Sequence, residues 1–233
     1  MCSKGLVIDL WINDAYHYMP SPIIIGIFEL TMMRTGESVD SKTLAHLFHE
    51  YLQGDDGAFY AANAKKGEKV SVIRALPHED AINRSEYMEV LDYEKATSII
   101  ESSEKFSIGI CSCRHEKLHV GEKACEVPLE KCSSFNRVAD HLVRNSLARE
   151  VSKSEMLENL AQSIEMGLVL CADNVKRNVT FICHCCKDCC NALAGISKFG
   201  YPNFVVTSSF IAKNDPGTCL GCGKCAKACP INA

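Results

Sequence analysis

The sequence predicts a mixed α/β (α+β) chain from two kinds of local pattern. Short apolar runs rich in β-branched residues, such as "VSVIRAL" at 70–76 and "VTFICHC" at 179–185, are typical of strands. Other segments, such as 39–54, place apolar residues three and four positions apart, which is typical of amphipathic helices. The cysteine-rich stretches follow the apolar runs, so we expect potential metal ligands at the ends of strands.

The composition is that of a globular protein that can bury a core without disulfides. The chain has 233 residues, of which 47% are hydrophobic and 23% charged, with a net charge of −4. Its longest apolar runs are too short to span a bilayer, so we expect a cytoplasmic protein. In a reducing cytosol, clustered cysteines indicate metal ligands or catalysts. The absence of a long basic run argues against a nucleic-acid partner.

The first half of the chain predicts a hairpin, a helix, a strand and a second helix. Residues 6–19 alternate apolar and polar side chains around Asn13 and Asp14, which indicates a hairpin with a tight turn. The helix over 39–54 has Ser41 as candidate N-cap and Gly54 as its stop. Its expected apolar face consists of Leu44, Leu47, Phe48, Tyr51 and Leu52. The strand at 70–76 and a helix near 92–103, with Ile99 and Ile100 facing inward, complete this half.

The second half predicts further strands and helices around the cysteines. Ser152 separates two expected helices at 134–149 and 153–166. Gly200 ends a third expected helix. Apolar runs typical of strands lie between these helices. The expected strands of this half are 106–114, 167–171, 179–185 and 204–212, and the third helix begins at "CCNALAG" (189–195).

The last fifteen residues carry the most specific motif. Cys219, Cys222, Cys225 and Cys229 with Pro230 match the C-x₂-C-x₂-C-x₃-C-P run that binds iron–sulfur clusters. A zinc ribbon is the alternative, but the spacing and the neighbouring glycines favour a cluster, because small residues let backbone N–H groups approach the sulfides.

Two further groups of cysteines lie upstream, each beginning with cysteines at i and i+2 after an apolar run. On a strand this spacing points both thiols to the same side. The first group forms C-x-C-x₁₁-C-x₆-C, enough for one four-thiol site, and consists of Cys111, Cys113, Cys125 and Cys132. The second has one thiol more than four ligands require and consists of Cys183, Cys185, Cys186, Cys189 and Cys190. An iron–sulfur cluster, a zinc ion and buried free thiols remain open for both groups. Cys2 and Cys171 are interpreted as ordinary small apolar residues.

The remaining polar residues give weaker signals. An i+1 neighbour of a strand-end ligand points away from it, so His184 and His115 are expected to be structural. Arg114 and Lys117 add positive charge near the first group, which would stabilise thiolates. No nucleophile elbow, P-loop or G-x-G-x-x-G is present in the sequence. No residue is therefore proposed as a catalytic nucleophile.

These motifs support a family resemblance that spans most of residues 20–233. "CLGCGKCAKACP" resembles one half of a bacterial-type dicluster ferredoxin. The upstream pattern, from "ICSCRHEK" through Cys125, Pro128 and Cys132 to "ICHCCKDCC", is similar to longer 4Fe-4S ferredoxin-domain proteins of anaerobic bacteria and archaea. In that family a winged-helix-like segment tends to precede "KGLV" and a second cluster motif tends to follow the first. The resemblance therefore suggests that the sequence is a fragment, with half of a ferredoxin module at its end.

The resemblance implies an electron-transfer protein more than a stand-alone enzyme. It would pass single electrons between a ferredoxin or oxidoreductase partner and one or more 4Fe-4S clusters, with zinc as a possible alternative at the upstream cysteines. The alternatives are an iron–sulfur subunit of a redox enzyme and a metal- or redox-sensing regulator with a winged-helix part. The expected regions are a hairpin or wing-like segment (1–35), a helical and strand scaffold (36–104), a cysteine-rich metal-binding region (105–211) and the ferredoxin-type motif (212–233).

Overall fold

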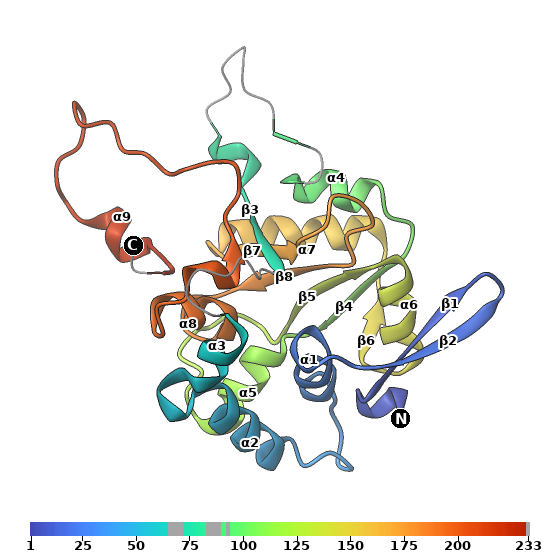
Figure 1. Cartoon of the computed structure of the whole chain (residues 1–233). Helices are drawn as coiled ribbons and strands as arrows, with labels where there is room; N and C mark the ends of the chain where they lie inside the picture. Colours follow the sequence, from blue (N-terminus) through green and yellow to red (C-terminus); the bar gives the residue numbers. More distant parts are fainter. Residues whose placement is uncertain (65–71, 83–89, 92–93, 232–233) are drawn as a thin grey trace.

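A computed structural model describes residues 1–64, 72–82, 90–91 and 94–231 (Figure 1). It confirms the mixed α/β class: one seven-stranded sheet crosses the centre of the molecule, and helices lie on both of its faces. None of the described helices is long and apolar enough to cross a membrane.

The central sheet is antiparallel except at one edge. Its strand order is β6-β4-β5-β8-β7-β3-β9, and only β3 and β9 pair in parallel. A separate hairpin consists of β1 and β2. The strands are β1 (Val7–Ile12), β2 (Ala15–Pro20), β3 (Ile73–Leu76), β4 (Phe106–Ile110), β5 (Glu130–Phe135), β6 (Ala148–Glu150), β7 (Val169–Asp173), β8 (Phe181–Cys185) and β9 (Val205–Val206).

The helices are mostly short, and the two longest have thirteen residues each. Both begin at a side chain that accepts a hydrogen bond from the helix backbone, Asp40 for α2 and Ser152 for α7. The α-helices are α1 (Phe28–Met32), α2 (Ser41–Gln53), α3 (Ala58–Asn63), α4 (Ala96–Glu101), α5 (Ser112–Val120), α6 (Asn136–Arg144), α7 (Lys153–Glu165), α8 (Asn191–Ser197) and α9 (Lys224–Ala228).

The alternation of side chains along β7 and β8 divides the core into two layers. Leu170 of β7 and Ile182 of β8 pack with α4 and α7 on one face of the sheet. Cys171 and Cys185 lie on the other face, in a core that α1, α2, α3 and α8 complete. Because successive residues of a strand point to opposite faces, the odd-numbered cysteines of these strands all face the second layer.

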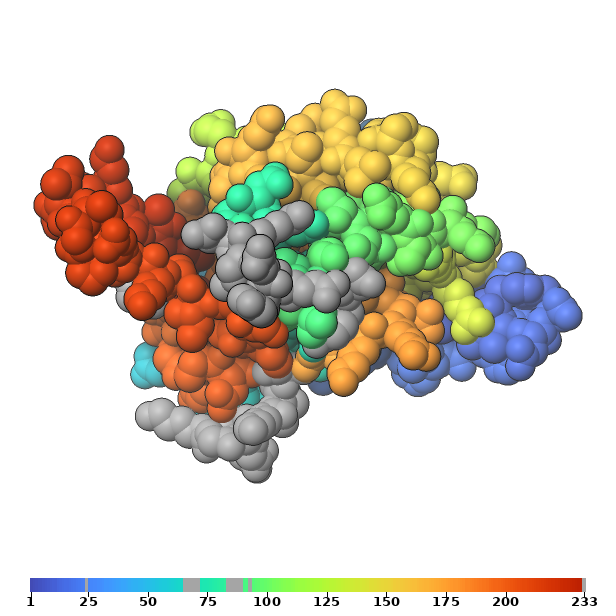
Figure 2. Space-filling view, turned by 90° about the horizontal axis from the view of Figure 1, so that it is seen from above, coloured from blue at the N-terminus to red at the C-terminus, as the bar shows by residue number. Residues whose placement is uncertain are grey.

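The predicted hairpin is confirmed, and both an ionic cluster and the apolar contact of Ile8 attach it to the body. Asn13 and Asp14 both have positive φ (50° and 58°), as a two-residue turn of the primed type requires. Asp9 of β1 contacts His141 and accepts from the Arg144 Nη1 of α6 at 2.7 Å. The hairpin and the C-terminal segment protrude at opposite ends of the molecule (Figure 2).

Two expected elements around the first cysteine group are confirmed only in part. The strand expected over 106–114 ends at Ile110, and Cys113 lies inside helix α5. The helix expected over 134–149 is confirmed as α6, but its expected ends belong to the strands β5 and β6. Ser133 and Ser134 of β5 are buried between β4 and β8, where ladder hydrogen bonds outweigh their weak strand propensity.

Smaller differences concern the ends and faces of elements. The N-cap of α2 is Asp40 rather than Ser41. Leu47 and Tyr51 are more than half exposed, so the apolar face of α2 is narrower than expected. The strand expected at 204–212 contains only Val205 and Val206. Parts of the expected elements at 70–76 and 92–103 lie outside the described residues.

The two-layer packing predicts which leucines carry stability. Leu170 is fully buried, so Leu170→Ala is expected to lower the free energy of unfolding by about 2–5 kcal/mol through lost burial and a cavity. Leu47→Ala is the matched control, since Leu47 is 58% exposed, and should stay within about 0.5 kcal/mol of wild type. Denaturant unfolding of the three proteins measures both effects. Equal destabilisation by the two substitutions would contradict this division of the core.

Candidate metal centres

Six cysteines converge from four places on one face of the sheet. Cys111 follows β4 and is the N-cap of α5, in whose first turn Cys113 lies. Cys132 lies on β5 opposite Gly109 of β4. Cys183 and Cys185 lie on β8, and Cys190 is the N-cap of α8. Two strand ends and two helix starts therefore bring together residues that are up to 79 positions apart in the sequence.

The six thiols form a closed ring of contacts, which we call the six-thiol ring. Each thiol changes the pKa of two neighbours, in the order Cys111, Cys113, Cys190, Cys185, Cys183, Cys132 and back to Cys111. No three of these sulfurs lie within 4.8 Å of one another. The ring is thus open at its centre rather than collapsed around one point.

The six-thiol ring lines a cavity of about 280 Å³ inside the second layer. Aromatic side chains of Phe48, Phe59 and Phe204 also line this cavity, as does the half-buried Glu29. Burial raises the pKa of Glu29 to about 7, although the Gly26 amide, which donates to it at 2.8 Å, opposes the change. The cavity combines soft sulfur donors with apolar walls, and this combination suits a buried iron–sulfur cluster.

Thiols of low and high pKa alternate around the ring. Hydrogen bonds from Cys113 and Cys132, together with the charge of Arg114, hold the pKa of Cys111 well below its usual range, against the effect of burial. Hydrogen bonds from Cys132 and Cys185 lower the pKa of Cys183 to about 6. Because neighbouring thiols share protons in this way, ionisation of one disfavours ionisation of the next. The thiols of lowered pKa are Cys111, Cys183 and Cys190, and those of raised pKa are Cys113, Cys132 and Cys185.

A second, compact group contains Cys125, Cys186 and Cys189, which we call the three-thiol site. The Cys125 Sγ lies 3.5 Å from that of Cys186 and 3.6 Å from that of Cys189. All three sulfurs lie within 4.8 Å of one another, and this is the one such group of metal-ligating side chains among the described residues. Leu168 and Val127 cover it with apolar surface.

The guanidinium group of Arg114 lies between the two thiol groups. Arg114 is fully buried, and its Nη2 donates to the main-chain oxygen of His184. Its charge interacts with Cys111 and Cys132 of the ring and with Cys186 of the three-thiol site. Burial opposes the charged form, but the thiolates raise the pKa of Arg114 further above its usual value. One cation therefore offsets negative charge at both sites.

A buried polar network holds the helices that carry the ring. The Glu116 Oε2 of α5 accepts from the Asn191 Nδ2 of α8 at 2.7 Å. The other oxygen of Glu116 lies 2.7 Å from the His49 Nδ1 of α2. The Tyr60 hydroxyl of α3 donates to the Asn191 carbonyl at 2.8 Å. These hydrogen bonds join α2, α3, α5 and α8 close to Cys113 and Cys190, since Glu116 lies on the helix of Cys113 and Asn191 follows Cys190. The network therefore restrains the positions of both thiols.

The C-terminal motif occupies an exposed segment outside the sheet. Cys219, Cys222 and Cys225 are exposed, and Cys229 is half-buried. Gly221 and Gly223 both have positive φ (62° and 70°), which lets the chain curl between the first three cysteines. A hydrogen bond from the Gly221 amide lowers the pKa of Cys219.

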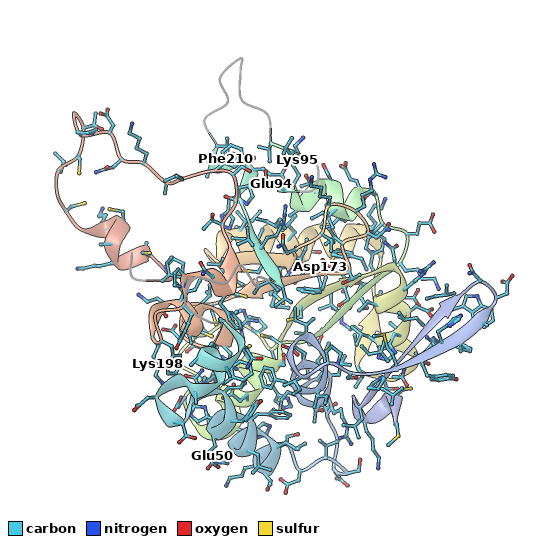
Figure 3. All side chains as sticks on the ribbon, in the orientation of Figure 1. Glu50, Glu94, Lys95, Asp173, Lys198 and Phe210 are labelled. Carbon is cyan, nitrogen blue, oxygen red and sulfur yellow. The ribbon has the colours of Figure 1, made fainter. Side chains whose placement is uncertain are left out.

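Contacts at both ends of its described part attach this segment to the body. At its start, the Ser209 amide and hydroxyl both donate to the buried Glu94 at 3.0 Å, close to Phe210 (Figure 3). At its end, Ile231 packs against the core of the second layer, which also contains Cys185 and Cys190 of the six-thiol ring. The end of the C-terminal segment and two cysteines of the ring therefore belong to the same hydrophobic core.

The structure regroups the upstream cysteines. It separates Cys125 from the other members of its expected four-thiol site and places it against Cys186 and Cys189. It also divides the second group, because Cys185 belongs to the ring and Cys186 does not. Cys171, interpreted as an ordinary apolar residue, is fully buried with its thiol against Cys185. Its pairing with Cys183 across β7 and β8 was not visible in the spacing.

The two histidines beside the motifs have structural partners. The His184 Nε2 lies 2.8 Å from the Ser133 hydroxyl, on the face of β8 away from the ring thiols. The His115 Nδ1 lies 2.6 Å from the Met32 carbonyl. Burial, together with the charges of Lys131 and Arg114, lowers the pKa of His184 to about 3, so its ring stays neutral.

Comparison with known proteins finds one match. The family model described as a 4Fe-4S binding domain matches residues 212–233. No curated protein and no solved structure was found to match. The family match and the fifteen cysteines support an iron–sulfur protein with a 4Fe-4S cluster at the C-terminal motif.

The contrast in burial predicts the order of thiol modification. In the reduced, metal-free and folded chain, Cys219, Cys222 and Cys225 are expected to react with a maleimide roughly ten-fold or more faster than the buried ring thiols Cys111, Cys185 and Cys190. Peptide mass spectrometry after brief labelling measures the order. The same reaction in denaturant is the control and should remove the difference. Equal rates in the folded chain would contradict the buried ring.

Proposed function

We propose that the chain is an iron–sulfur electron-transfer protein with two redox centres, one at Cys219, Cys222, Cys225 and Cys229 and one in the six-thiol ring. The observation that carries the proposal is the 4Fe-4S binding domain match at residues 212–233. Electron transfer is the chemistry that such clusters supply, with potentials set by cluster charge, hydrogen bonds to the sulfurs and exposure.

Three features of the six-thiol ring support a second cluster there. Its donors are all sulfur, the ligand type that selects iron–sulfur clusters and zinc. Its sulfurs surround a cavity instead of meeting at a point, which suits a polynuclear cluster better than a single ion. Arg114 offsets the negative charge that several thiolates bring into the core. Four of the six thiols suffice for one cubane cluster.

The difference in exposure gives the two centres different roles. The C-terminal cysteines are exposed, so a redox partner could approach a cluster held there closely. The ring thiols are less accessible, since Cys111, Cys185 and Cys190 are buried and Cys113, Cys132 and Cys183 are half-buried. Because Ile231 packs into the core that contains Cys185 and Cys190, electrons from the exposed centre would enter the body near the ring. The partner is expected to be a ferredoxin or an oxidoreductase.

One observation favours a second candidate, an iron–sulfur subunit of a redox enzyme. The cavity of the six-thiol ring extends along the aromatic side chains of Phe48, Phe59 and Phe204, which offer an apolar surface that a small substrate could occupy. A change in the reduced-cluster spectrum on addition of a substrate would support this candidate, whereas electron transfer alone would not.

Iron content and spectroscopy of cysteine variants test the two-centre proposal. Anaerobically purified wild-type chain is expected to hold about eight iron atoms with matching sulfide, four for each cubane cluster. Cys222→Ser is expected to lose about four irons, and a chain with Cys111, Cys113 and Cys132 all changed to Ser, which leaves three ring thiols, is expected to lose the other four; the two changes should remove different parts of the dithionite-reduced EPR signal. Cys2→Ser is the matched control, because Cys2 lies outside both sites, and should keep the full signal.

The variants separate the two halves of the proposal. Wild-type protein with about four irons, all of them lost in Cys222→Ser, would remove the ring centre and leave a single-cluster carrier. Retention of the full EPR signal in Cys222→Ser would contradict the C-terminal cluster itself.

A further inference from the structure

The three-thiol site differs from both proposed cluster sites in its spacing. Neither the six-thiol ring nor the exposed motif brings three of its described sulfurs within 4.8 Å of one another, and Cys125, Cys186 and Cys189 do. A cubane cluster holds its cysteine sulfurs apart because irons and sulfides stand between them. A single metal ion draws its ligands toward one point.

The separations at the three-thiol site suit a tetrahedral ion. With Zn–S bonds of about 2.3 Å, two sulfurs of a tetrahedron lie about 3.8 Å apart. The Cys125 Sγ lies 3.5 Å from the Cys186 Sγ and 3.6 Å from the Cys189 Sγ, close to that value. We propose that Cys125, Cys186 and Cys189 bind one zinc ion, separate from the iron–sulfur centres.

The local backbone supports this assignment. Cys186 and Cys189 have the C-x₂-C spacing of zinc-binding turns, and the Cys190 amide closes this turn on the Cys186 carbonyl at 3.3 Å. The Cys189 amide also donates to the Cys186 sulfur, as amides do toward metal-bound thiolates. Cys125 comes from the irregular segment between α5 and β5, so zinc would fasten this segment to the turn after β8.

Charge and ligand count define the fourth position. Three thiolates and one Zn²⁺ carry a net charge of −1, and Arg114 beside Cys186 supplies the balancing +1. Among the described residues, no fourth Cys, His, Asp or Glu lies within 4.8 Å of all three sulfurs. Zinc with three protein ligands keeps a position for water or another small ligand. We therefore assign the fourth position to an exchangeable, non-protein ligand.

Element-specific measurements on the full chain test the proposal. Anaerobically purified protein is expected to contain about one zinc per chain in addition to its iron. Zinc K-edge absorption should show about three sulfurs at ~2.3 Å and one oxygen or nitrogen at ~2.0 Å. Cys125→Ser is expected to lose most of the zinc while keeping its iron and its EPR signal. Cys2→Ser should keep both metals.

The other outcomes would overturn the assignment. Loss of iron from Cys125→Ser would make the three-thiol site part of a cluster. Zinc lost from Cys113→Ser but kept in Cys125→Ser would place the ion in the six-thiol ring. Four sulfurs around zinc would contradict the exchangeable fourth ligand. Protein with its full iron content but no zinc would show that the three cysteines are packed thiols without a metal. All of these results are independent of the C-terminal cluster, which Cys222→Ser tests separately.

Discussion

The burial of the Arg114 guanidinium between two groups of thiols is the interaction on which the site depends. Several cysteines packed in an apolar core cannot all ionise without a compensating charge, since buried like charges repel strongly. Arg114 supplies this charge to Cys111 and Cys132 on one side and to Cys186 on the other. It does so from the first turn of α5, whose N-cap is Cys111 itself. The strand-to-helix junction therefore brings a ring thiol and its counter-charge together.

The sheet and the polar network give this junction a fixed position. The alternation along β8 sends Cys183 and Cys185 to one face and His184 to the other, where Ser133 holds its ring. On the cysteine face, Glu116 joins α5 to α8 through Asn191, the first residue after Cys190. A buried carboxylate with partners on both oxygens is costly to break, so it keeps the two helix starts in register.

Much of this arrangement could be predicted from the sequence, but the grouping of the ligands could not. The hairpin turn at Asn13 and Asp14 and the C-terminal motif depend on adjacent residues, and local chemistry specifies both. The start of α5 after Cys111 and the strand β5 depend on tertiary packing, which overrides local propensity. Cys125 was grouped with its neighbours in sequence, whereas its contacts lie 61 and 64 residues further along the chain.

The segment from Cys185 to Cys190 connects the two upstream sites. Its outer cysteines, 185 and 190, belong to the six-thiol ring, and its inner ones, 186 and 189, to the three-thiol site. This division accounts for a run with more thiols than one four-ligand site can use. The inner and outer pairs share one turn but face different sites. Zinc has no redox chemistry of its own. Zinc at the three-thiol site would contribute to electron transfer by keeping this turn rigid while the charge of a cluster in the six-thiol ring changes.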